Sequence, residues 1–334
     1  MKNDIISHPF ILLKGLSLFV LVILSLLWGC ERNSKSQSRD TLSGNLVIFH
    51  AGSLSVPFKE IADSFETRYP DINVQREVSG SVECARKIRD LKRECDIMAS
   101  ADYKVIDQFL IPEYTDWLVR FAANEMALIY QKSSKYNGEI NKSNWFNIIQ
   151  RDDVLYGRSD PDSDPCGYRT VLSLRLAEKY YERPGMADRI LSKDNKYMRP
   201  KETDLLALLE SDVIDYIFLY RSVAEQHGFE YLMLPDSINL GKPELREWYN
   251  TVSVDIAGKR PGKNISVQGE SMIYGVTMLE NAPNPEIAHA FLHFLLSEDS
   301  GMKIIEKNGQ ETLVPASTRY YKNLPEEFRQ YTRQ

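Results

Sequence analysis

Residues 45–80 read NLVIFHAGSLSVPFKEIADSFETRYPDINVQREVSG, and this stretch indicates the fold class. Its first part, Leu46–Phe49, is a continuous apolar run closed by a turn, which is typical of a buried strand. Apolar residues then recur at helical spacing between Val56 and Phe65, and Pro70 ends that pattern. The segment INVQREVSG follows as a second strand pattern. The stretch therefore predicts a strand, a helix and a second strand.

The same alternation continues with SVECARKIRDLKRE, a helix pattern, and CDIMASADY, a strand that ends in a polar turn. Strands that alternate with helices in this way predict βαβ units and a parallel sheet. The Ala-Gly-Ser and Ser-Gly-Ser turns both follow a strand and precede a helix. Open α/β sheets bind ligands at this edge, so we expect a ligand site there.

A second region has the same alternation of strand and helix patterns but a different sequence. NEMALIYQ, VLYGRS and YIFLY are strand patterns, and helix patterns lie between and after them. The part of the chain with such patterns runs from about residue 45 to about residue 330. A chain of this length favours two lobes over one core.

Charge and cysteine content exclude several classes of function. The net charge of −6 and the absence of a basic stripe argue against a nucleic-acid partner. The four cysteines include no C-x-x-C pair, so a zinc or redox site is not supported. Cys84 and Cys95 either form one disulfide or are small buried apolar residues, and the sequence leaves both open.

Residues 1–30 have the pattern of a secretory signal peptide. The run Gly15–Gly29 is uncharged and strongly apolar, but it is short for a membrane span. It ends in LLWGC, which resembles the lipobox of bacterial lipoproteins and predicts lipidation of Cys30. An uncleaved signal-anchor helix is the alternative. Residues 31–44 are polar and Ser-rich, and they predict a flexible tether.

Ser53 and Ser81 occupy the two strand-to-helix turns. Each hydroxyl either caps its helix or helps to bind an anion at the helix end. Two such turns in successive βα units favour one shared crevice. A serine hydrolase with His50 as the base is disfavoured, because AGSLS lacks the G-x-S-x-G pattern.

The segment SDPDSDPCGYRT, residues 159–170, places Asp160, Asp162 and Asp164 ahead of a predicted helix. Clustered carboxylates favour a cation, whereas a helix N-terminus favours an anion. Asp164 precedes Pro165, which suits the first helical position, so Asp164 also has the features of an N-cap.

Glu202 and Tyr220 are further candidates. Glu202 lies near a predicted helix start, where an acid also interacts favourably with the helix dipole. Tyr220 ends an apolar strand, so its hydroxyl points into the crevice or its ring packs in the core.

Seven segments together resemble one known family: VIFHAGSL, SGSVECARKI, CDIMASADY, DPCGYR, DYIFLYRSVAEQHGF, YGVTM and GQETLVP. They resemble the periplasmic tungstate/molybdate-binding proteins of ABC transporters, in particular their archaeal-type branch. The resemblance covers about Leu46 to Ser317. It implies an α/β fold of the type II periplasmic-binding-protein kind, with two lobes, each a mostly parallel sheet flanked by helices. The ligand is then expected in the cleft between the lobes.

On this resemblance we expect lobe 1 to comprise residues 45–124 and 269–334, and lobe 2 residues 125–268. The chain is expected to cross between them near residues 122–126 and 265–272.

The resemblance also implies a ligand site. Asp164 and Glu202 are expected to coordinate the W or Mo centre directly; if the register slips, Asp204 replaces Glu202. The remaining expected contacts are hydroxyl groups of Ser53, Ser81 and Tyr220 and backbone N–H groups of Gly52 and Cys166. Two carboxylates repel a dianion unless they bind its central atom directly. A hard, high-valent W or Mo centre accepts carboxylate ligands, whereas the sulfur atom of sulfate does not. The same pair would therefore select against sulfate.

The implied function is that of a lipid-anchored receptor on the periplasmic side of the cell membrane. It would be monomeric, without cofactor or catalysis, and would deliver tungstate or molybdate to an ABC transporter permease. The alternatives are a receptor for sulfate, phosphate or ferric iron, or an extracytoplasmic serine hydrolase. Iron receptors often use adjacent tyrosines, and Tyr180–Tyr181 is such a pair. The sequence does not rank tungstate over molybdate.

Overall fold

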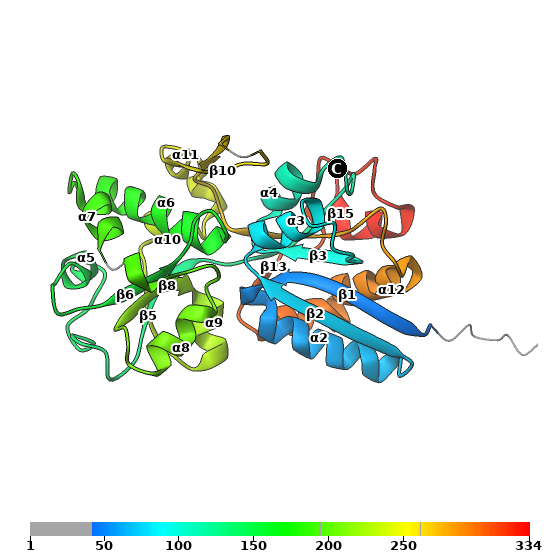
Figure 1. Cartoon of the computed structure of the whole chain (residues 1–334), viewed down its shortest axis with the longest axis horizontal. Coiled ribbons are helices and arrows are strands. Elements are labelled where there is room, and N and C mark those ends of the chain that lie inside the picture. Colours follow the sequence, from blue (N-terminus) through cyan, green and yellow to red (C-terminus); the bar gives the residue numbers. More distant parts are fainter. Residues whose placement is uncertain (1–41, 194, 261) are drawn as a thin grey trace, which may run out of the picture. The chain divides into compact units, whose positions relative to one another are not determined.

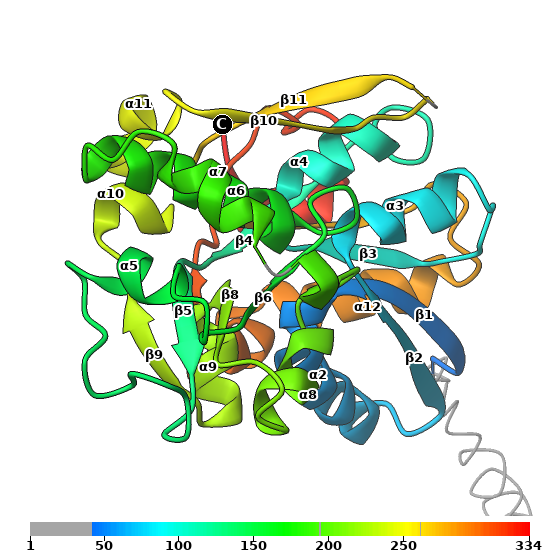
Figure 2. The same cartoon turned by 60° about the vertical axis from the view of Figure 1, so that its left-hand side comes forward.

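The computed structural model describes residues 42–193, 195–260 and 262–334 (Figures 1 and 2). The predicted signal peptide, the predicted lipidation site Cys30 and nearly all of the predicted tether lie outside the described residues. Within these residues, no helix combines the length and the apolar composition that crossing a bilayer requires. The strands form a six-stranded sheet, a five-stranded sheet and two two-stranded sheets.

The six-stranded sheet contains the fold predicted for the first part of the chain. Its order is β13-β4-β12-β3-β1-β2. Strand β1 is parallel to both β2 and β3, whereas β12 is antiparallel to β3 and β4, and β13 is antiparallel to β4. Its strands are β1 (Gly44–Ala51), β2 (Ile72–Ser79), β3 (Ile97–Ser100), β4 (Val119–Ala123), β12 (Ile273–Met278) and β13 (Glu311–Thr312). Helices α2 (Ser55–Arg68) and α3 (Ser81–Arg89) connect the first three strands, so the predicted β-α-β-α-β order is confirmed.

The five-stranded sheet has the order β7-β6-β8-β5-β9. Strand β6 is parallel to β7 and β8, and β5 is antiparallel to β8 and β9. Its strands are β5 (Met126–Tyr130), β6 (Tyr156–Ser159), β7 (Met198–Arg199), β8 (Tyr216–Tyr220) and β9 (Glu230–Met233). Helices α6 (Pro165–Tyr180), α8 (Asp204–Glu210) and α9 (Arg221–His227) pack on its strands. Four of the five strands share one direction, with β5 reversed between β8 and β9, so this sheet is mixed, as the six-stranded sheet is.

Two segments carry the chain between the sheets. Residues 124–125 connect β4 to β5, and residues 269–272 lead from the hairpin of β10 (Ser253–Ala257) and β11 (Asn264–Gln268) into β12. The segments lie side by side, since Asn124 N donates to Met272 O at 3.4 Å. The remaining helices and strands are α4 (Tyr103–Val105), α5 (Trp145–Ile149), α7 (Met186–Ser192), α10 (Asp236–Asn239), α11 (Arg246–Tyr249), α12 (Pro285–Leu296), α13 (Lys303–Lys307), β14 (Ala316–Ser317) and β15 (Thr332–Arg333).

The core beside the six-stranded sheet explains the helical spacing of apolar residues in the sequence, because these residues lie on the buried face of α2. Phe58 and Phe65 lie on the buried face of α2, where both pack against Phe291 of α12. Cys84 and Cys95 are also buried here, and both are free thiols. The disulfide that the sequence left open is therefore absent. Burial raises the pKa of the Cys84 thiol to about 12, so it acts as a small apolar residue.

Candidate functional site

The two serine turns lie next to each other at one edge of the six-stranded sheet. Strands β1 and β2 are parallel neighbours with Ala51 opposite Ser79, so the turns that follow them are adjacent. Ser53 lies in the short helical turn Gly52–Leu54, and Ser81 is the first residue of α3. Both serines are buried. The two turns are therefore close enough to line one crevice.

Asp164 and Glu202 come from two loops that flank the five-stranded sheet. Asp164 caps α6, and its Oδ1 accepts a hydrogen bond from Cys166 N at 3.3 Å. Its other oxygen, Oδ2, accepts from Glu202 N at 3.0 Å. This bond ties the loop before α8 to the start of α6 and places the two acids together. Asp204, the alternative to Glu202, forms an ion pair with Lys201 instead.

Close backbone contacts bring these loops onto the serine turns. A Cβ at Gly52 would lie 2.9 Å from the carboxylate carbon and both oxygens of Glu202. A Cβ at Gly80 would lie 2.3 Å from Ser163 O and 3.0 Å from Pro200 O. Only glycine leaves room for such an approach. The residues predicted from the sequence thus meet in one buried cluster built from both sheets.

Within residues 42–193, 195–260 and 262–334, no cationic side chain pairs with the carboxylate of Asp164 or of Glu202. Asp164 and Glu202 are fully buried, and within the described chain neither oxygen of the Glu202 carboxylate has a hydrogen-bond partner. Burial, and then the charge of Asp164, raises the pKa of Glu202 well above its ordinary value. Burial also raises the pKa of Asp164, although its contact with the Glu202 side chain, and then hydrogen bonds from backbone N–H groups, act against this shift. Uncompensated buried carboxylates are costly, and they are suited to bind a hard positive centre.

Three hydroxyl groups in the cluster are arranged as donors. In each, the oxygen accepts a hydrogen bond: Ser81 Oγ from Ala101 N at 3.0 Å, Tyr220 Oη from Arg169 Nη1 at 3.2 Å, and Ser53 Oγ from Tyr274 Oη at 3.0 Å. A hydroxyl carries one hydrogen, which these bonds leave available for a ligand. Oxygen-rich anions need such donors.

A buried ion pair connects α6 to the end of β3. Arg169 Nη2 lies 3.3 Å from Asp102 Oδ2, and the two side chains are only 3% and 5% exposed. Tyr168 Oη donates to the same Asp102 oxygen at 2.7 Å, and Arg169 Nη1 donates to Ala101 O at 2.8 Å. The backbone of Ala101 is thus bound through its N–H by Ser81 and through its carbonyl by Arg169, so this ion pair supports the hydroxyl donors.

Comparison with known proteins identifies the family. A family model described as bacterial extracellular solute-binding protein matches residues 46–311. The chain belongs to this family of solute-binding proteins. Among its relatives is an uncharacterized solute-binding protein of Petrotoga mobilis, 46% identical over 87% of this chain and 91% of the relative. The molybdate/tungstate-binding protein WtpA of Pyrococcus abyssi is 39% identical over 94% of this chain and 97% of its own.

Solved structures agree on the fold. The periplasmic molybdate-binding protein of Azotobacter vinelandii aligns with a TM-score of 0.57 at 12% identity, over 79% of this chain and 98% of that one. The sulfate-binding protein SubI of Mycobacterium tuberculosis aligns with a TM-score of 0.56 at 9% identity, over 81% and 88%. The predicted two-lobed type II fold and the resemblance to molybdate/tungstate-binding proteins are confirmed. The finer lobe boundaries stay a prediction.

Other candidates in this solute-binding protein have structural roles. Asp160 holds its own loop, accepting from Asp162 N at 3.0 Å and from Ser163 Oγ at 3.1 Å. Asp162 Oδ1 accepts from Ala257 N at 2.7 Å, which ties the loop to the β10–β11 hairpin. These two aspartates therefore stabilise loops, and of the three only Asp164 joins the buried cluster.

The residues of the alternative functions are likewise engaged elsewhere. His50 Nδ1 bonds to its neighbour Ala51 O at 2.8 Å, and burial lowers the pKa of His50 to about 4. Tyr180 is about half exposed, and Tyr181 packs against Phe146 with ring centroids 4.5 Å apart. Neither arrangement forms part of the cluster.

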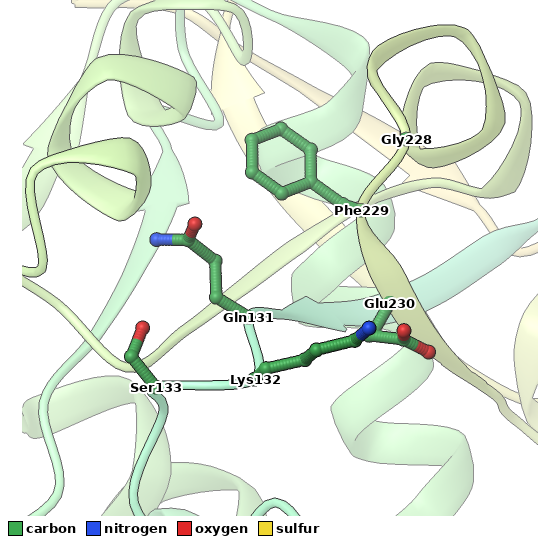
Figure 3. A pocket seen from close by; sticks show the side chains of 6 residues that line it. All are labelled: Gln131, Lys132, Ser133, Gly228, Phe229 and Glu230. Carbon is green, nitrogen blue, oxygen red and sulfur yellow. The ribbon is translucent and has the colours of Figure 1, made fainter.

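A surface hollow of about 350 Å³ lies away from the cluster (Figure 3). It follows the far end of β5: Met126 pairs with Tyr220 near the cluster, whereas Tyr130 pairs with Tyr216 and Gln131 lines the hollow. Two of its polar side chains already have partners, since Gln131 Nε2 donates to Leu209 O and Ser133 Oγ to Asp212 Oδ1. The hollow is lined by Gln131, Lys132, Ser133, Gly228, Phe229 and Glu230.

Sequence reasoning missed Asp102, Arg169 and Tyr274. Arg169 lies within the DPCGYR motif, so a search for the partner of a motif arginine would have raised it as a candidate. Asp102 ends a strand beside the expected ligand edge, which is a weaker signal. Nothing in the sequence around Tyr274 indicates its contact with Ser53, which is 221 residues away.

Proposed function

We propose that this solute-binding protein captures molybdate or tungstate outside the cytoplasm and delivers it to an ABC importer. One observation carries the proposal: among the described residues, the buried carboxylates of Asp164 and Glu202 have no cation as a partner and lie beside three hydroxyl donors. A relative named as a molybdate/tungstate-binding protein, 39% identical over nearly the whole chain, supports it.

The donor set suits a metal that arrives as an oxyanion. A carboxylate 4 Å from a unit negative charge costs about 4 kcal/mol at an effective dielectric of about 20. Direct coordination by Asp164 and Glu202 reverses this cost, because hard oxygen ligands suit a hard, high-valent centre. The hydroxyls of Ser53, Ser81 and Tyr220 would then donate to the oxo groups. In this arrangement Gly52 N is an additional donor, whereas Cys166 N already donates to Asp164 Oδ1 and would reach the ligand only by sharing its hydrogen.

The wider setting follows from the same proposal. The protein would be a monomer without cofactor, anchored through a lipid on Cys30 at the periplasmic side of the membrane, and would pass its ligand to a permease. It would have no catalytic activity, because Ser53 Oγ bonds to Tyr274 and His50 bonds to Ala51 O.

A receptor for a plain oxyanion such as sulfate is the second candidate. Hydroxyl donors suit sulfate as well, and the sulfate-binding SubI shares the fold. The carboxylate pair argues against it, since sulfur does not accept carboxylate ligands and the negative charges would repel.

Isothermal titration calorimetry with tungstate, molybdate and sulfate tests the proposal, using the wild type and Asp164→Ala. We expect tight binding of the first two, no binding of sulfate, and at least a hundredfold loss in the variant. Comparable sulfate binding or an unaffected variant would show that the site is a simple anion pocket. If none of the three anions binds the wild type, the assigned ligand is wrong.

A further inference from the structure

Three buried side chains form a chain of hydrogen bonds that ends on a candidate ligand group. Asn124 Nδ2 donates to Tyr274 Oη at 3.0 Å, and Tyr274 Oη donates to Ser53 Oγ at 3.0 Å. The exposed fractions of Asn124, Tyr274 and Ser53 are 5%, 0% and 1%. Groups this deeply buried do not exchange their partners freely with water, so the geometry of the chain is well defined.

The direction of these bonds follows from the chemistry of the groups. Asn124 Oδ1 accepts from Glu125 N at 3.0 Å, which identifies the other end of the amide as the NH2 group. An NH2 group only donates, so the Tyr274 oxygen accepts and the Tyr274 hydrogen is directed to Ser53 Oγ. Burial raises the pKa of Tyr274 to about 12, so the phenol keeps this hydrogen at neutral pH.

We propose that Tyr274, oriented by Asn124, is a positioning residue that commits the Ser53 hydroxyl to donate to the bound oxyanion. The inference rests on the proposed function, in which Ser53 contacts the ligand. With its oxygen already accepting from Tyr274, the Ser53 hydroxyl directs its own hydrogen to another acceptor. Ser53 follows Gly52, which lies against the Glu202 carboxylate, so that hydrogen is beside the place where the ligand is expected.

The start of the chain lies where the two connecting segments meet. Asn124 belongs to the first segment, and Tyr274 is the second residue of β12, directly after the other segment. The register of β12 against β4 shifts between Tyr274 and Gly275, and such irregularities re-aim side chains. Asn124 Nδ2 also donates to Ser222 Oγ at 2.7 Å, at the start of α9 beside the other sheet. The orientation of Ser53 is therefore coupled to the packing of the two segments through which the lobes are connected.

A double-mutant cycle with tungstate as the ligand tests this role, because it separates action through Ser53 from general structural damage. The variants are Tyr274→Phe, Ser53→Ala and the double variant, with dissociation constants measured by calorimetry. We expect Tyr274→Phe to weaken binding about tenfold and Ser53→Ala roughly 10- to 100-fold. In the Ser53→Ala background, Tyr274→Phe should change affinity by less than about twofold.

Tyr249→Phe is the matched control. It also removes a buried phenol hydroxyl, one that accepts from Lys242 N at 3.2 Å and donates to Asp236 O at 2.5 Å, but outside the cluster. Its affinity for tungstate should equal that of the wild type. If Tyr274→Phe does not fold, Asn124→Ala replaces it in the same cycle, with a loss in affinity again expected only when Ser53 is present.

The outcomes separate the inference from the function on which it rests. Loss of affinity only in the presence of Ser53 supports the positioning role. Equal losses in both backgrounds, or no loss in either, overturn it while the wild type still binds tungstate. A wild type that binds neither tungstate nor molybdate overturns the proposed function and, with it, the role of Tyr274.

Discussion

At the scale of single residues, the buried acids lower the stability of the ligand-free protein and, in the proposed function, supply ligands for the bound oxyanion. In the part of the chain that the structure describes, neither carboxylate oxygen of Glu202 has a hydrogen-bond partner, and both burial and Asp164 disfavour its charged form. Such a group is retained at a cost to the ligand-free protein when its charge is needed for binding. The cost is measurable when the carboxylate is replaced by an amide of the same shape.

Glu202→Gln should therefore stabilise the ligand-free protein at pH 7 and abolish its stabilisation by molybdate. The amide needs neither a buried charge nor the uptake of a proton on folding, so the free energy of unfolding should rise by about 1–3 kcal/mol, or the melting temperature by about 2–6 °C. Thermal unfolding with and without molybdate measures both effects. Glu210→Gln, an exposed acid at the end of α8, is the control and should behave as the wild type. A Glu202→Gln protein that molybdate still stabilises would contradict the role of Glu202.

The stability of the ligand-free protein should depend on pH, and the raised pKa values of the two acids determine the direction. The pKa values of Asp164 and Glu202 are raised by folding, so the folded state binds more protons than the unfolded state between the ordinary and the raised pKa values. The free energy of unfolding of the ligand-free protein should consequently fall as the pH rises through this range. Direct coordination requires the charged carboxylates, so molybdate binding should release protons.

Calorimetry at pH 6 in buffers with different ionisation enthalpies measures that release. A net uptake of protons, or none exchanged, would argue against coordination by the carboxylates.

At the scale of elements, the turn between β2 and α3 must approach the loops that carry the acids. Gly80 has an extended backbone, φ −59° and ψ 142°, which alanine also adopts, so its small size matters through the contact with Ser163 O. Gly80→Ala should weaken tungstate binding at least tenfold, because a Cβ 2.3 Å from that oxygen forces the loop away.

Gly138→Ala is the control for that substitution, since a Cβ there has nothing within 4 Å. Calorimetric titration of both variants checks the expectation. Equal affinities would show that the turn and the loop separate without loss of the site.

At the scale of the whole molecule, the ion pair between Arg169 and Asp102 connects the two sheets. Asp102→Asn leaves a buried guanidinium without its counter-charge, which typically costs about 3–5 kcal/mol. We expect a lower midpoint of urea unfolding and weaker tungstate binding, because Arg169 also orients Tyr220.

The control removes an ion pair of the same type from the surface. Asp63 pairs with Lys59 at 2.6 Å, but both side chains are more than half exposed. Asp63→Asn should leave the urea midpoint and the affinity nearly unchanged, since exposed pairs contribute little. If the two asparagine variants behave alike, the buried pair does not hold the sheets together.

The local features of the protein were determined by the sequence itself. The alternation of β1, α2, β2, α3 and β3 follows from hydrophobic periodicity, and the capping role of Asp164 follows from the adjacent Pro165. These features depend on residues within one or two turns of each other, so neighbouring residues are sufficient to specify them. The serine turns at the sheet edge were predictable for the same reason.

Only the tertiary structure decided which distant groups meet. The bond from Glu202 N to Asp164 joins residues 38 positions apart, and the bond from Tyr274 to Ser53 joins residues 221 apart. It also decided that Cys84 and Cys95 remain free thiols and that Asp102 pairs with Arg169. Such contacts depend on sheet order and on where the chain crosses between sheets, and no local pattern encodes either. The physical reason is that propensity and periodicity act over a few residues, whereas the site is built by packing of the entire fold.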